Sequence, residues 1–354
     1  MKLVPRENAS AAWVFSVYAA AVMGALFLSL LLLALYGVPL GRALAAINQG
    51  TLADPRGFAE VLRRAVPLAL AGAGLALAFR AQFWNIGAEG QLLIGAVAAS
   101  GMALFWPLPG GWVLLVMALA AFLAAGLWAV LPALLKATLA VNDVITTLML
   151  NYIAIYLVEW LIHGPWRGKS LFGFAYTEKF PENAWLPLWP GTGLAWPGLL
   201  LAVAVAALFA WLLFRTTLGF EARVVGENPE AARYAGVRAA RTLLWIALFS
   251  GGAAGLAGFV EVAGHHHRLL APLQISLGYG YTAIIVAWLG RNHPLAALFT
   301  GLLLGFVFAA GDVAKVALQV PFQLVGAANG LILFALIAAE VLIRYRVRWG
   351  WGRV

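Results

Sequence analysis

Long apolar segments alternate with short polar ones along almost the whole chain. A helix needs roughly 20 predominantly apolar residues to cross a bilayer. About ten segments approach or exceed this length: 12–36, 66–80, 86–106, 112–135, 141–162, 197–214, 242–263, 276–290, 295–311 and 321–343. The pattern predicts an all-α polytopic membrane protein with about ten transmembrane helices. The segments 66–80 and 276–290 are short and rich in glycine, which is typical of broken helices beside a transport path.

The polar connections predict how the chain is divided and oriented. We expect one transmembrane domain over residues 1–354, with a Trp- and Pro-rich external loop at 163–196 and a cytoplasmic loop at 215–241. An even number of spans places both termini on one side, and most Lys and Arg residues lie on that side, including the basic tail at 344–348. The positive-inside rule then predicts that both termini are cytoplasmic. The first apolar run is too long for the core of a signal peptide, so we expect a retained span.

Composition excludes several classes of protein. Hydrophobic residues make up 64% of the chain and charged residues 10%, whereas soluble domains have about 45–50% and about 25%. Soluble enzymes and nucleic-acid-binding modules are therefore excluded, and the net charge of +9 reflects basic loops rather than a nucleic-acid partner. The absence of cysteine excludes disulfides, thiolate catalysis and zinc–cysteine sites.

Segment 79–96 is unusually polar for its place between two apolar runs. It contains Arg80, Asn85, Glu89 and Gln91. A charge at membrane depth costs about 2.5–3.5 kcal/mol on insertion scales, so Glu89 requires a partner or a wet cavity. Two structures fit the pattern. One is a discontinuous helix that lines a pathway, and the other is an interfacial turn in which Arg80 reaches the lipid headgroups.

Two further segments carry polar groups at helix ends or at membrane depth. Asn142 and Asp143 can cap the helix that follows, with the carboxylate near free amides. Asn151 lies deeper, where we expect it to hydrogen-bond between helices, with substrate contact as the alternative. Residues 278–294 form a short apolar segment that ends in a polar turn, and they are another candidate half-helix.

The cytoplasmic run 226–237 predicts a short helix of about two turns. Pro229 stands near its start and Gly236 near its end. Such a helix is too short to be stable alone, so we expect it to dock on a partner. A membrane-surface helix held by Arg233 and Tyr234 is the alternative.

Several other patterns are structural rather than chemical. Gly168-Lys169-Ser170 lacks the earlier glycine of a phosphate loop, and His265-His266-His267 fits an external loop tip better than a metal site. Pairs of small residues four apart predict helix-packing faces; these are Gly251/Gly255, Gly301/Gly305 and Gly326/Gly330.

Residues 83–91 and 142–152 resemble the inner-membrane permeases of nucleoside-type ABC importers, within the superfamily of ribose and branched-chain amino acid permeases. Glu230-Ala231-Ala232 followed by Gly236 resembles the Glu-Ala-Ala…Gly loop by which such permeases grip their ATPase. The resemblance covers about residues 60–340. Phe83 and Trp84 depart from it, since smaller residues often precede the asparagine, and this departure leaves the size of the substrate open.

The resemblance implies a permease subunit that forms the path for nucleosides and is not itself an enzyme. The implied partners are a cytoplasmic ABC ATPase that binds ATP-Mg, a related second permease in a heterodimer, and an external substrate-binding lipoprotein. The chain would bind no cofactor and no nucleic acid, and would span the bacterial plasma (inner) membrane many times. Import direction is implied by the resemblance alone.

Two sets of residues are expected to carry this function. The substrate pathway is expected to comprise Phe83, Trp84, Asn85, Glu89, Gln91, Asn142, Asn151 and Trp288, because amides and aromatic rings suit a neutral nucleoside. Coupling to the ATPase is expected at Glu227, Asn228, Glu230, Ala231, Ala232, Arg233, Tyr234 and Gly236. No catalytic or metal-binding residue is expected.

Three other functions remain open. A permease for simple sugars such as ribose would share much of the pattern. An ion-coupled secondary transporter could use Glu89 or Asp143 as a proton site, although it would leave the helix within 226–237 unexplained. A membrane-embedded enzyme would need clustered carboxylates or a paired nucleophile and base, which the apolar segments lack.

Overall fold

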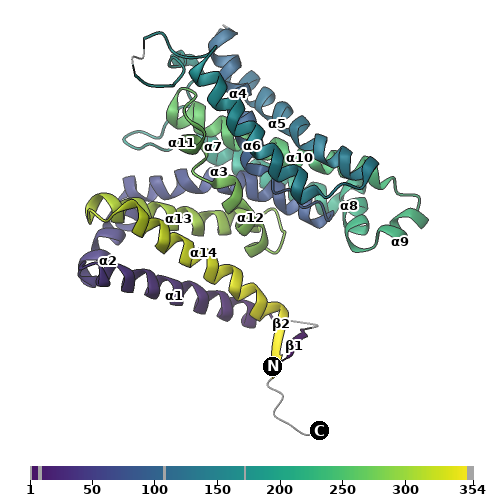
Figure 1. Ribbon diagram of the computed structural model, residues 1–354, viewed down its shortest axis with the longest axis horizontal. Helices are drawn as coiled ribbons and strands as arrows, with labels where there is room; N and C mark the ends of the chain where they lie inside the picture. Colours follow the sequence, from purple (N-terminus) through teal and green to yellow (C-terminus); the bar gives the residue numbers. More distant parts are fainter. Residues whose placement is uncertain (1, 7–9, 107–108, 171–172, 349–354) are drawn as a thin grey trace. The chain divides into compact units, whose positions relative to one another are not determined.

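The computed structural model describes residues 2–6, 10–106, 109–170 and 173–348 (Figure 1). Ten helices in these ranges are long and apolar enough to cross a membrane. They cover residues 12–35, 55–80, 88–105, 112–139, 143–163, 196–215, 239–266, 272–289, 296–317 and 323–343. The all-α polytopic fold and the number of spans are thereby confirmed, while the side on which the termini lie stays a prediction. Residues 171–172 of the predicted external loop and Arg353 lie outside the described residues.

The helices follow one another with short connections. In chain order they are α1 (Ala11–Leu35), α2 (Leu40–Asn48), α3 (Pro55–Arg80), α4 (Ala88–Phe105), α5 (Trp112–Leu139), α6 (Asp143–His163), α7 (Trp196–Arg215), α8 (Thr217–Glu227), α9 (Pro229–Tyr234), α10 (Ala239–Glu261), α11 (Pro272–Ser276), α12 (Tyr279–Leu289), α13 (Ala296–Ala317) and α14 (Phe322–Arg344). Short π-helical turns form η1 (Gln49–Ala53) and η3 (Val262–His266), and a short 3₁₀ turn forms η2 (Glu182–Ala184).

The chain divides into two compact units, and the first comprises Met1–Phe58 and Val307–Val354. In this unit α1 packs along α14, and the Ser29 hydroxyl donates a hydrogen bond to the Ala328 carbonyl at 3.4 Å. Strands β1 (Lys2–Pro5) and β2 (Tyr345–Arg348) pair antiparallel, with Lys2 opposite Arg348. This small ladder was not predicted, because segments of four residues are too short to carry a clear strand signal. The single transmembrane domain over 1–354 stays a prediction.

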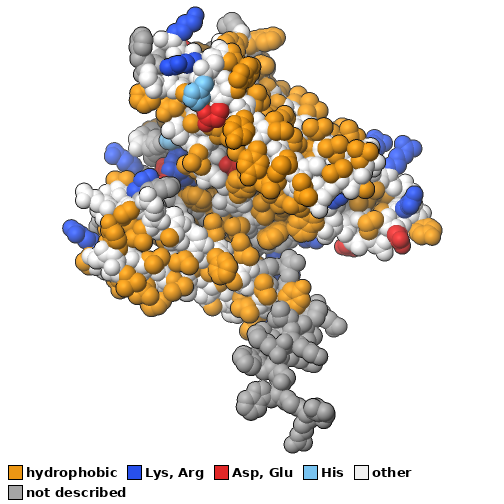
Figure 2. All heavy atoms as spheres, in the orientation of Figure 1, with side chains coloured by type: hydrophobic (Ala, Val, Ile, Leu, Met, Phe, Trp, Pro, Cys, Tyr) orange, Lys and Arg blue, Asp and Glu red, His pale blue; other side chains and the backbone are white. Residues whose placement is uncertain are grey.

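The second unit, Ala59–Phe306, is built around α4, α5 and α10. Small residues let these backbones approach closely, as in other membrane helix pairs. A Cβ at Gly255 would overlap the Ala121 carbonyl of α5, and one at Gly95 would overlap Gly255 itself. Figure 2 shows hydrophobic side chains over the sides of these helices and basic side chains near α8 and α9.

The predicted helix-packing pairs have different outcomes. Gly251/Gly255 packs on α5 and Gly301/Gly305 packs on α3, which confirms both predictions. The prediction for Gly326/Gly330 is wrong within the described chain, since no atom lies within 4 Å of a Cβ built at either position.

The two segments predicted to be short differ in the structure. The segment 276–290 is broken, because Leu277 and Gly278 have φ of 47° and 76° and separate α11 from α12. The segment 66–80 is not short. It belongs to the 26-residue helix α3, whose first turns contain Glu60, Arg63 and Arg64 and therefore look polar in the sequence.

Candidate functional site

The turn 81–87 joins α3 to α4 and is fixed mainly by α6. The Trp84 amide donates to the Asp143 carboxylate at 2.7 Å, and the Ile86 amide donates to the Thr147 hydroxyl at 3.2 Å. The chain forms a turn between two helices here, and whether this turn lines a pathway stays a prediction. Arg80 does not reach outward from it, because its guanidinium donates to the carbonyls of Asn292 and Arg291 at 3.2 and 3.4 Å.

Asn85 is the centre of a buried polar cluster beneath this turn. Its Nδ2 donates to Gln91 Oε1 at 2.9 Å and to Ser250 Oγ at 3.1 Å. Its Oδ1 accepts from the Gly87 amide at 3.0 Å and from Gln91 Nε2 at 2.8 Å. An asparagine amide offers two donors and two acceptor sites, so the side chain is fully matched within the chain. The cluster joins α4 to α10.

Asn151 makes a second link, between α6 and the start of α4. Its Oδ1 accepts from the Gly90 amide at 2.8 Å, and its Nδ2 donates to the Ile86 carbonyl at 2.9 Å. The same Nδ2 lies 3.4 Å from the hydroxyl of Tyr281, whose side chain is partly exposed. The predicted hydrogen bonding between helices is confirmed, and substrate contact by Asn151 stays a prediction.

Glu89 lies in the first turn of α4. Its buried side chain contacts the start of α12, next to the break in the chain. Its carboxylate accepts a hydrogen bond from the Gly280 amide at 2.8 Å. Gly280 packs directly on Glu89, because a Cβ there would overlap the Glu89 backbone. Negative charge is favourable at a helix N-terminus, where free amides and the dipole meet it. The break at Gly278 therefore provides the partner that Glu89 requires at this depth.

The capping prediction for α6 holds for one residue and not for the other. Asn142 caps the helix, accepting from the amides of Val144 at 2.9 Å and Ile145 at 3.4 Å. The Asp143 carboxylate does not cap α6, because Asn142 already occupies these amides. It accepts instead from the Trp84 amide and pairs with Lys136 at 2.6 Å.

Aromatic rings lie on the other side of the turn. Trp84 packs edge-on against Trp288, with ring centroids 6.1 Å apart. The ring centroids of Phe79 and Trp84 are 5.4 Å apart. Both tryptophans are half-buried, whereas Phe83 is fully buried. The structure therefore brings Trp84 and Trp288 together, half-buried, and buries Phe83, whose ring lies 5.9 Å from the Lys136 ammonium. Whether these residues contact a substrate stays a prediction.

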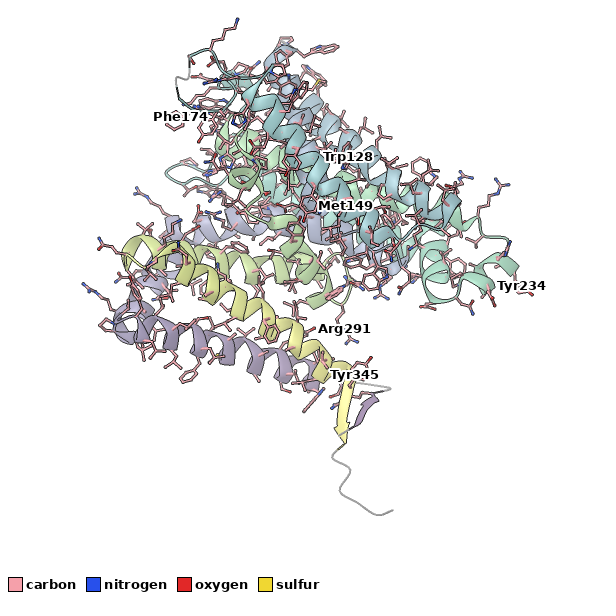
Figure 3. All side chains as sticks on the ribbon, viewed as in Figure 1. Trp128, Met149, Phe174, Tyr234, Arg291 and Tyr345 are labelled. Carbon is pink, nitrogen blue, oxygen red and sulfur yellow. The ribbon has the colours of Figure 1, made fainter. Side chains whose placement is uncertain are left out.

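Helix α9 projects from the end of the unit that carries α8. Asn228 caps it by accepting from the amides of Glu230 and Ala231, both at 3.0 Å, and Gly236 follows it with φ of 76°. The predicted helix within 226–237 is thereby confirmed. Tyr234 is 95% exposed, and Figure 3 shows it at the outer end of the helix.

The residues expected to couple to an ATPase share one exposed surface, with one exception. Exposed are Glu227, Asn228, Glu230, Ala231, Arg233, Tyr234 and Gly236. Ala232 is buried and holds the helix against the unit.

A charged cluster at the opposite end was missed from the sequence. Glu60 pairs with Arg63 and, at 3.1 Å, with Arg64. Glu261, only 2% exposed, lies 3.6 Å from His266 Nε2. The signal in the sequence was that Arg63 and Arg64 follow Glu60 by three and four residues, which pairs them on a helix. The predicted span began at residue 66, after all three residues, so this pairing was not predicted.

The histidines are not the loop tip that was predicted. His265 and His266 belong to η3, which continues α10. His267 stacks on Trp185 with ring centroids 4.2 Å apart. Burial lowers the pKa of His267 from its ordinary value. The segment 163–196 packs over this turn, with the Leu186 amide donating to the Ala263 carbonyl at 2.9 Å.

Several known proteins have similar sequences. Residues 57–341 match the family described as branched-chain amino acid transport system / permease component. The chain is 41% identical over 308 residues to the glucose ABC transporter permease protein of Haloferax volcanii, covering 84% of this chain and 80% of that protein. It is 30% identical over 300 residues to the nucleoside ABC transporter permease protein of Lactococcus lactis, covering 82% of each chain. It is 29% identical over 334 residues to a guanosine ABC transporter permease protein of Bacillus subtilis, covering 92% of each chain.

Each of these three organisms also has a second similar permease protein. The second proteins are named for glucose (as putative), for nucleosides and for guanosine, respectively. The superfamily indicated by residues 83–91 and 142–152 is confirmed. The chain therefore belongs to the family of permease components of the branched-chain amino acid transport type, and it is a multi-pass membrane permease of an ABC transporter.

Proposed function

We propose that this chain forms the translocation path of an ABC importer for nucleosides in the plasma (inner) membrane of a bacterial cell. ATP would be hydrolysed on a separate cytoplasmic subunit, so this chain would be a permease and not an enzyme. The sequence has no complete phosphate loop, which supports that division. Family membership supports the assignment to ABC transport.

The observation that carries the proposal is the exposed surface of α9. A six-residue helix has little stability of its own, yet this one is capped by Asn228 and held by the buried Ala232. It presents Glu230, Arg233 and the exposed ring of Tyr234 outward. Tyrosine and arginine are among the residues enriched at interface hot spots. We propose that this surface docks in a groove of the ATPase.

The experiment is purification of the tagged chain from its native membranes, with identification of the proteins that accompany it. The expected result is a phosphate-loop ATPase together with a second multi-span permease. Glu230→Lys combined with Tyr234→Ala should lower recovery of the ATPase at least about tenfold, which corresponds to about 1.4 kcal/mol, without loss of membrane insertion.

Glu182→Lys is the matched control, since Glu182 is an exposed glutamate in the loop at the other end of the unit. Equal recovery of the ATPase with the wild-type chain and with the α9 variant would contradict docking at α9. Recovery of the chain alone, in a membrane extract that preserves other transporters, would favour an ion-coupled mechanism instead.

The expected substrate is neutral and rich in hydrogen-bonding groups. Asn85 has no unused hydrogen-bonding group in this conformation, so direct contact would first require breaking an internal bond. We therefore propose that the half-buried Trp84 and Trp288 and the partly exposed Tyr281 contact the substrate first. Asn85 and Asn151 would hold these groups in place from behind.

A simple sugar is the second candidate substrate. The 41% identity to a glucose permease protein favours it, whereas the nucleoside and guanosine relatives favour the first candidate. A cluster of aromatic rings suits both, because sugars and nucleobases each present a face to an aromatic side chain.

The proposed assembly contains two related permeases, an ATPase and an external substrate-binding lipoprotein. The pairs of similar permease proteins in three organisms support a heterodimer. No cofactor is proposed for this chain, and ATP-Mg would bind the ATPase.

A further inference from the structure

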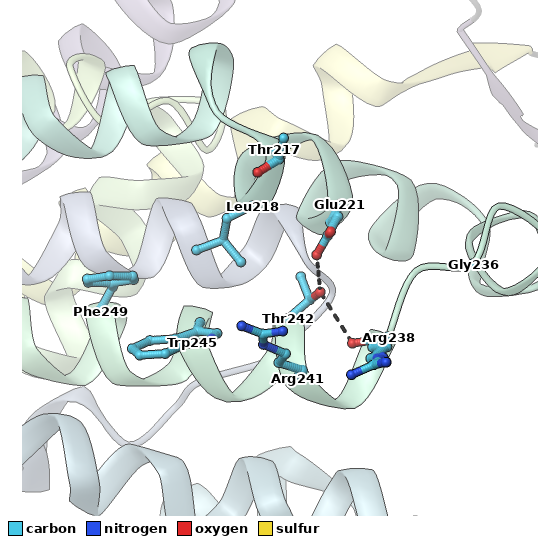
Figure 4. Close-up of a pocket in the computed structure, with 9 residues that line it drawn as sticks. All are labelled: Thr217, Leu218, Glu221, Gly236, Arg238, Arg241, Thr242, Trp245 and Phe249. Carbon is cyan, nitrogen blue, oxygen red and sulfur yellow. Dashed lines mark hydrogen bonds between the residues drawn. The ribbon is translucent and has the colours of Figure 1, made fainter.

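A pocket of about 590 Å³ lies between α8 and the beginning of α10 (Figure 4). Its walls are formed by Thr217, Leu218, Glu221, Gly236, Arg238, Arg241, Thr242, Trp245 and Phe249. All these residues belong to the second unit, and none of them takes part in the polar cluster around Asn85. Apart from Gly236, the residues that line the pocket are distinct from those expected to couple to an ATPase.

The water-facing part of the pocket carries a net positive charge. Arg238 and Arg241 are both exposed, and neither forms a salt bridge in the described part of the chain. Glu221 provides one opposing charge, and its carboxylate accepts a hydrogen bond from the Thr242 hydroxyl at 2.7 Å. The first turn of α10 receives no side-chain cap from Arg238, so its amide groups add to the positive potential.

The part of the pocket farther along α10 is aromatic. Trp245 and Phe249 follow Arg241 at intervals of four residues, which places the three side chains along one face of α10. Leu218 of α8 faces them across the pocket (Figure 4). Trp245 remains 44% exposed. Because residues 239–266 are long and apolar enough to cross a membrane, we expect the arginines at a membrane surface and the aromatic rings deeper.

This order of groups matches a phospholipid from its phosphate to its acyl chain. Guanidinium groups bind phosphate oxygens through paired charge-assisted hydrogen bonds. A carboxylate accepts hydrogen bonds from headgroup hydroxyls, and a partly exposed tryptophan is typical of the membrane interface. A free phosphate ester would satisfy the arginines but would leave Trp245 and Phe249 uncovered.

We propose that the pocket binds one phosphatidylglycerol molecule. Its phosphate would lie between Arg238 and Arg241, its glycerol hydroxyls would donate to Glu221, and one acyl chain would cover Trp245 and Phe249. The bound lipid would brace α8 against α10 and so fix the position from which α9 projects.

The test is quantification of the lipid that stays with the complex after purification from nanodiscs containing equal amounts of phosphatidylglycerol and phosphatidylcholine. Arg238→Gln combined with Arg241→Gln should lower the retained phosphatidylglycerol about tenfold, because basic residues near a membrane surface attract anionic lipid. Arg215→Gln is the matched control: Arg215 is exposed at the same end of the unit but is not part of the pocket.

Three results separate the possible outcomes. Arg241→Lys, which keeps the positive charge, should retain most of the lipid that the wild type retains. This result would show that the double variant loses lipid through its missing charges and not through misfolding. Equal retention in the wild type and the double variant, or an equal loss with Arg215→Gln, would overturn the site. Displacement of the lipid by glycerol phosphate at equal concentration would also overturn it, since the pocket would then recognise a soluble phosphate ester.

Discussion

Asn85 uses every hydrogen-bonding group of its side chain inside the protein. Its partners are Gln91, Ser250 and the Gly87 amide, and the side chain is fully buried. Leaving a buried polar group unpaired costs about 1–3 kcal/mol. The residue therefore acts first as a structural link between the turn 81–87 and α10.

Asn85→Ala should lower the free energy of unfolding by about 2–4 kcal/mol, because it leaves more than one buried partner unpaired. Thermal unfolding in detergent would measure the effect as a lower Tm. Gln323→Ala, which changes an exposed amide on α14, should leave Tm nearly unchanged. Equal Tm values for the wild type and Asn85→Ala would contradict the structural role.

His293 gives a pH-dependent contribution to stability. Burial, followed by the nearby positive charge of Arg80, lowers the pKa of His293 below its ordinary value of 6.5. The folded state thus favours the neutral ring, which stacks on Phe214 with centroids 4.9 Å apart. This contribution to stability is fully present at a pH above the pKa of His293 in the unfolded chain. It is lost as the pH falls through the pKa of His293 in the folded chain.

Acidification from about pH 7.5 to about pH 5 should therefore lower Tm more for the wild type than for His293→Gln. Thermal scans at both pH values would measure the two losses. His163→Gln, which changes an exposed histidine, should lower Tm on acidification by as much as in the wild type. An identical loss of Tm in the wild type and His293→Gln would rule out this contribution.

At the scale of elements, the break between α11 and α12 sets the position of Glu89. Gly278 has a φ of 76°, which side chains with a Cβ adopt at a cost of roughly 1–2 kcal/mol. The break also frees the Gly280 amide for the Glu89 carboxylate. A continuous helix over 272–289 would remove this partner.

Gly278→Val should therefore destabilise the chain clearly, whereas Gly278→Asn should be tolerated better, because asparagine adopts the left-handed conformation more readily. Gly330→Val is the control, since a Cβ at Gly330 meets open space. The yield of folded protein and its Tm would measure all three variants. Similar results for Val and Asn at position 278 would show that its backbone conformation is unimportant.

The elements themselves could largely be predicted from the sequence. The membrane fixes the length of an apolar span, so the ten segments followed directly from hydropathy. Helix α9 followed from Pro229 and Gly236. The beginning of α3 could not be located, because Arg63 and Arg64 make it look like a loop, although Glu60 pairs with both.

The contacts of the candidate site could not be predicted in the same way. Asn85 and Ser250 are separated by 165 positions in the sequence, and Gly280 and Glu89 by 191. Sequence patterns show that polar groups at membrane depth need partners, but they do not say which partners. Those assignments depend on how α4, α6, α10 and α12 pack.

At the scale of the whole molecule, the class of solute can be tested by competition between nucleosides and sugars. The half-buried rings of Trp84 and Trp288 lie together, and either candidate solute could stack on them. Uptake of labelled guanosine into cells that contain the full transporter would distinguish the two. We expect unlabelled nucleosides to compete for uptake and glucose to compete at least about tenfold more weakly, a difference of about 1.4 kcal/mol.

Trp84→Ala should lower this uptake while the protein remains in the membrane. Trp106→Ala, which removes an exposed tryptophan outside the turn, is the control. Stronger competition by glucose than by nucleosides would reassign the substrate class to sugars without affecting the assignment to ABC transport.

The closed polar cluster around Asn85 also limits how this sequence can change over evolutionary time. A protein with about 5–15 kcal/mol of total stability loses a large share of it when one member of such a cluster is replaced alone. Replacement of Asn85, Gln91 or Ser250 by an apolar residue therefore passes through a weakened intermediate unless its neighbours change with it. Across related permeases these three positions should vary together, as a set rather than one by one.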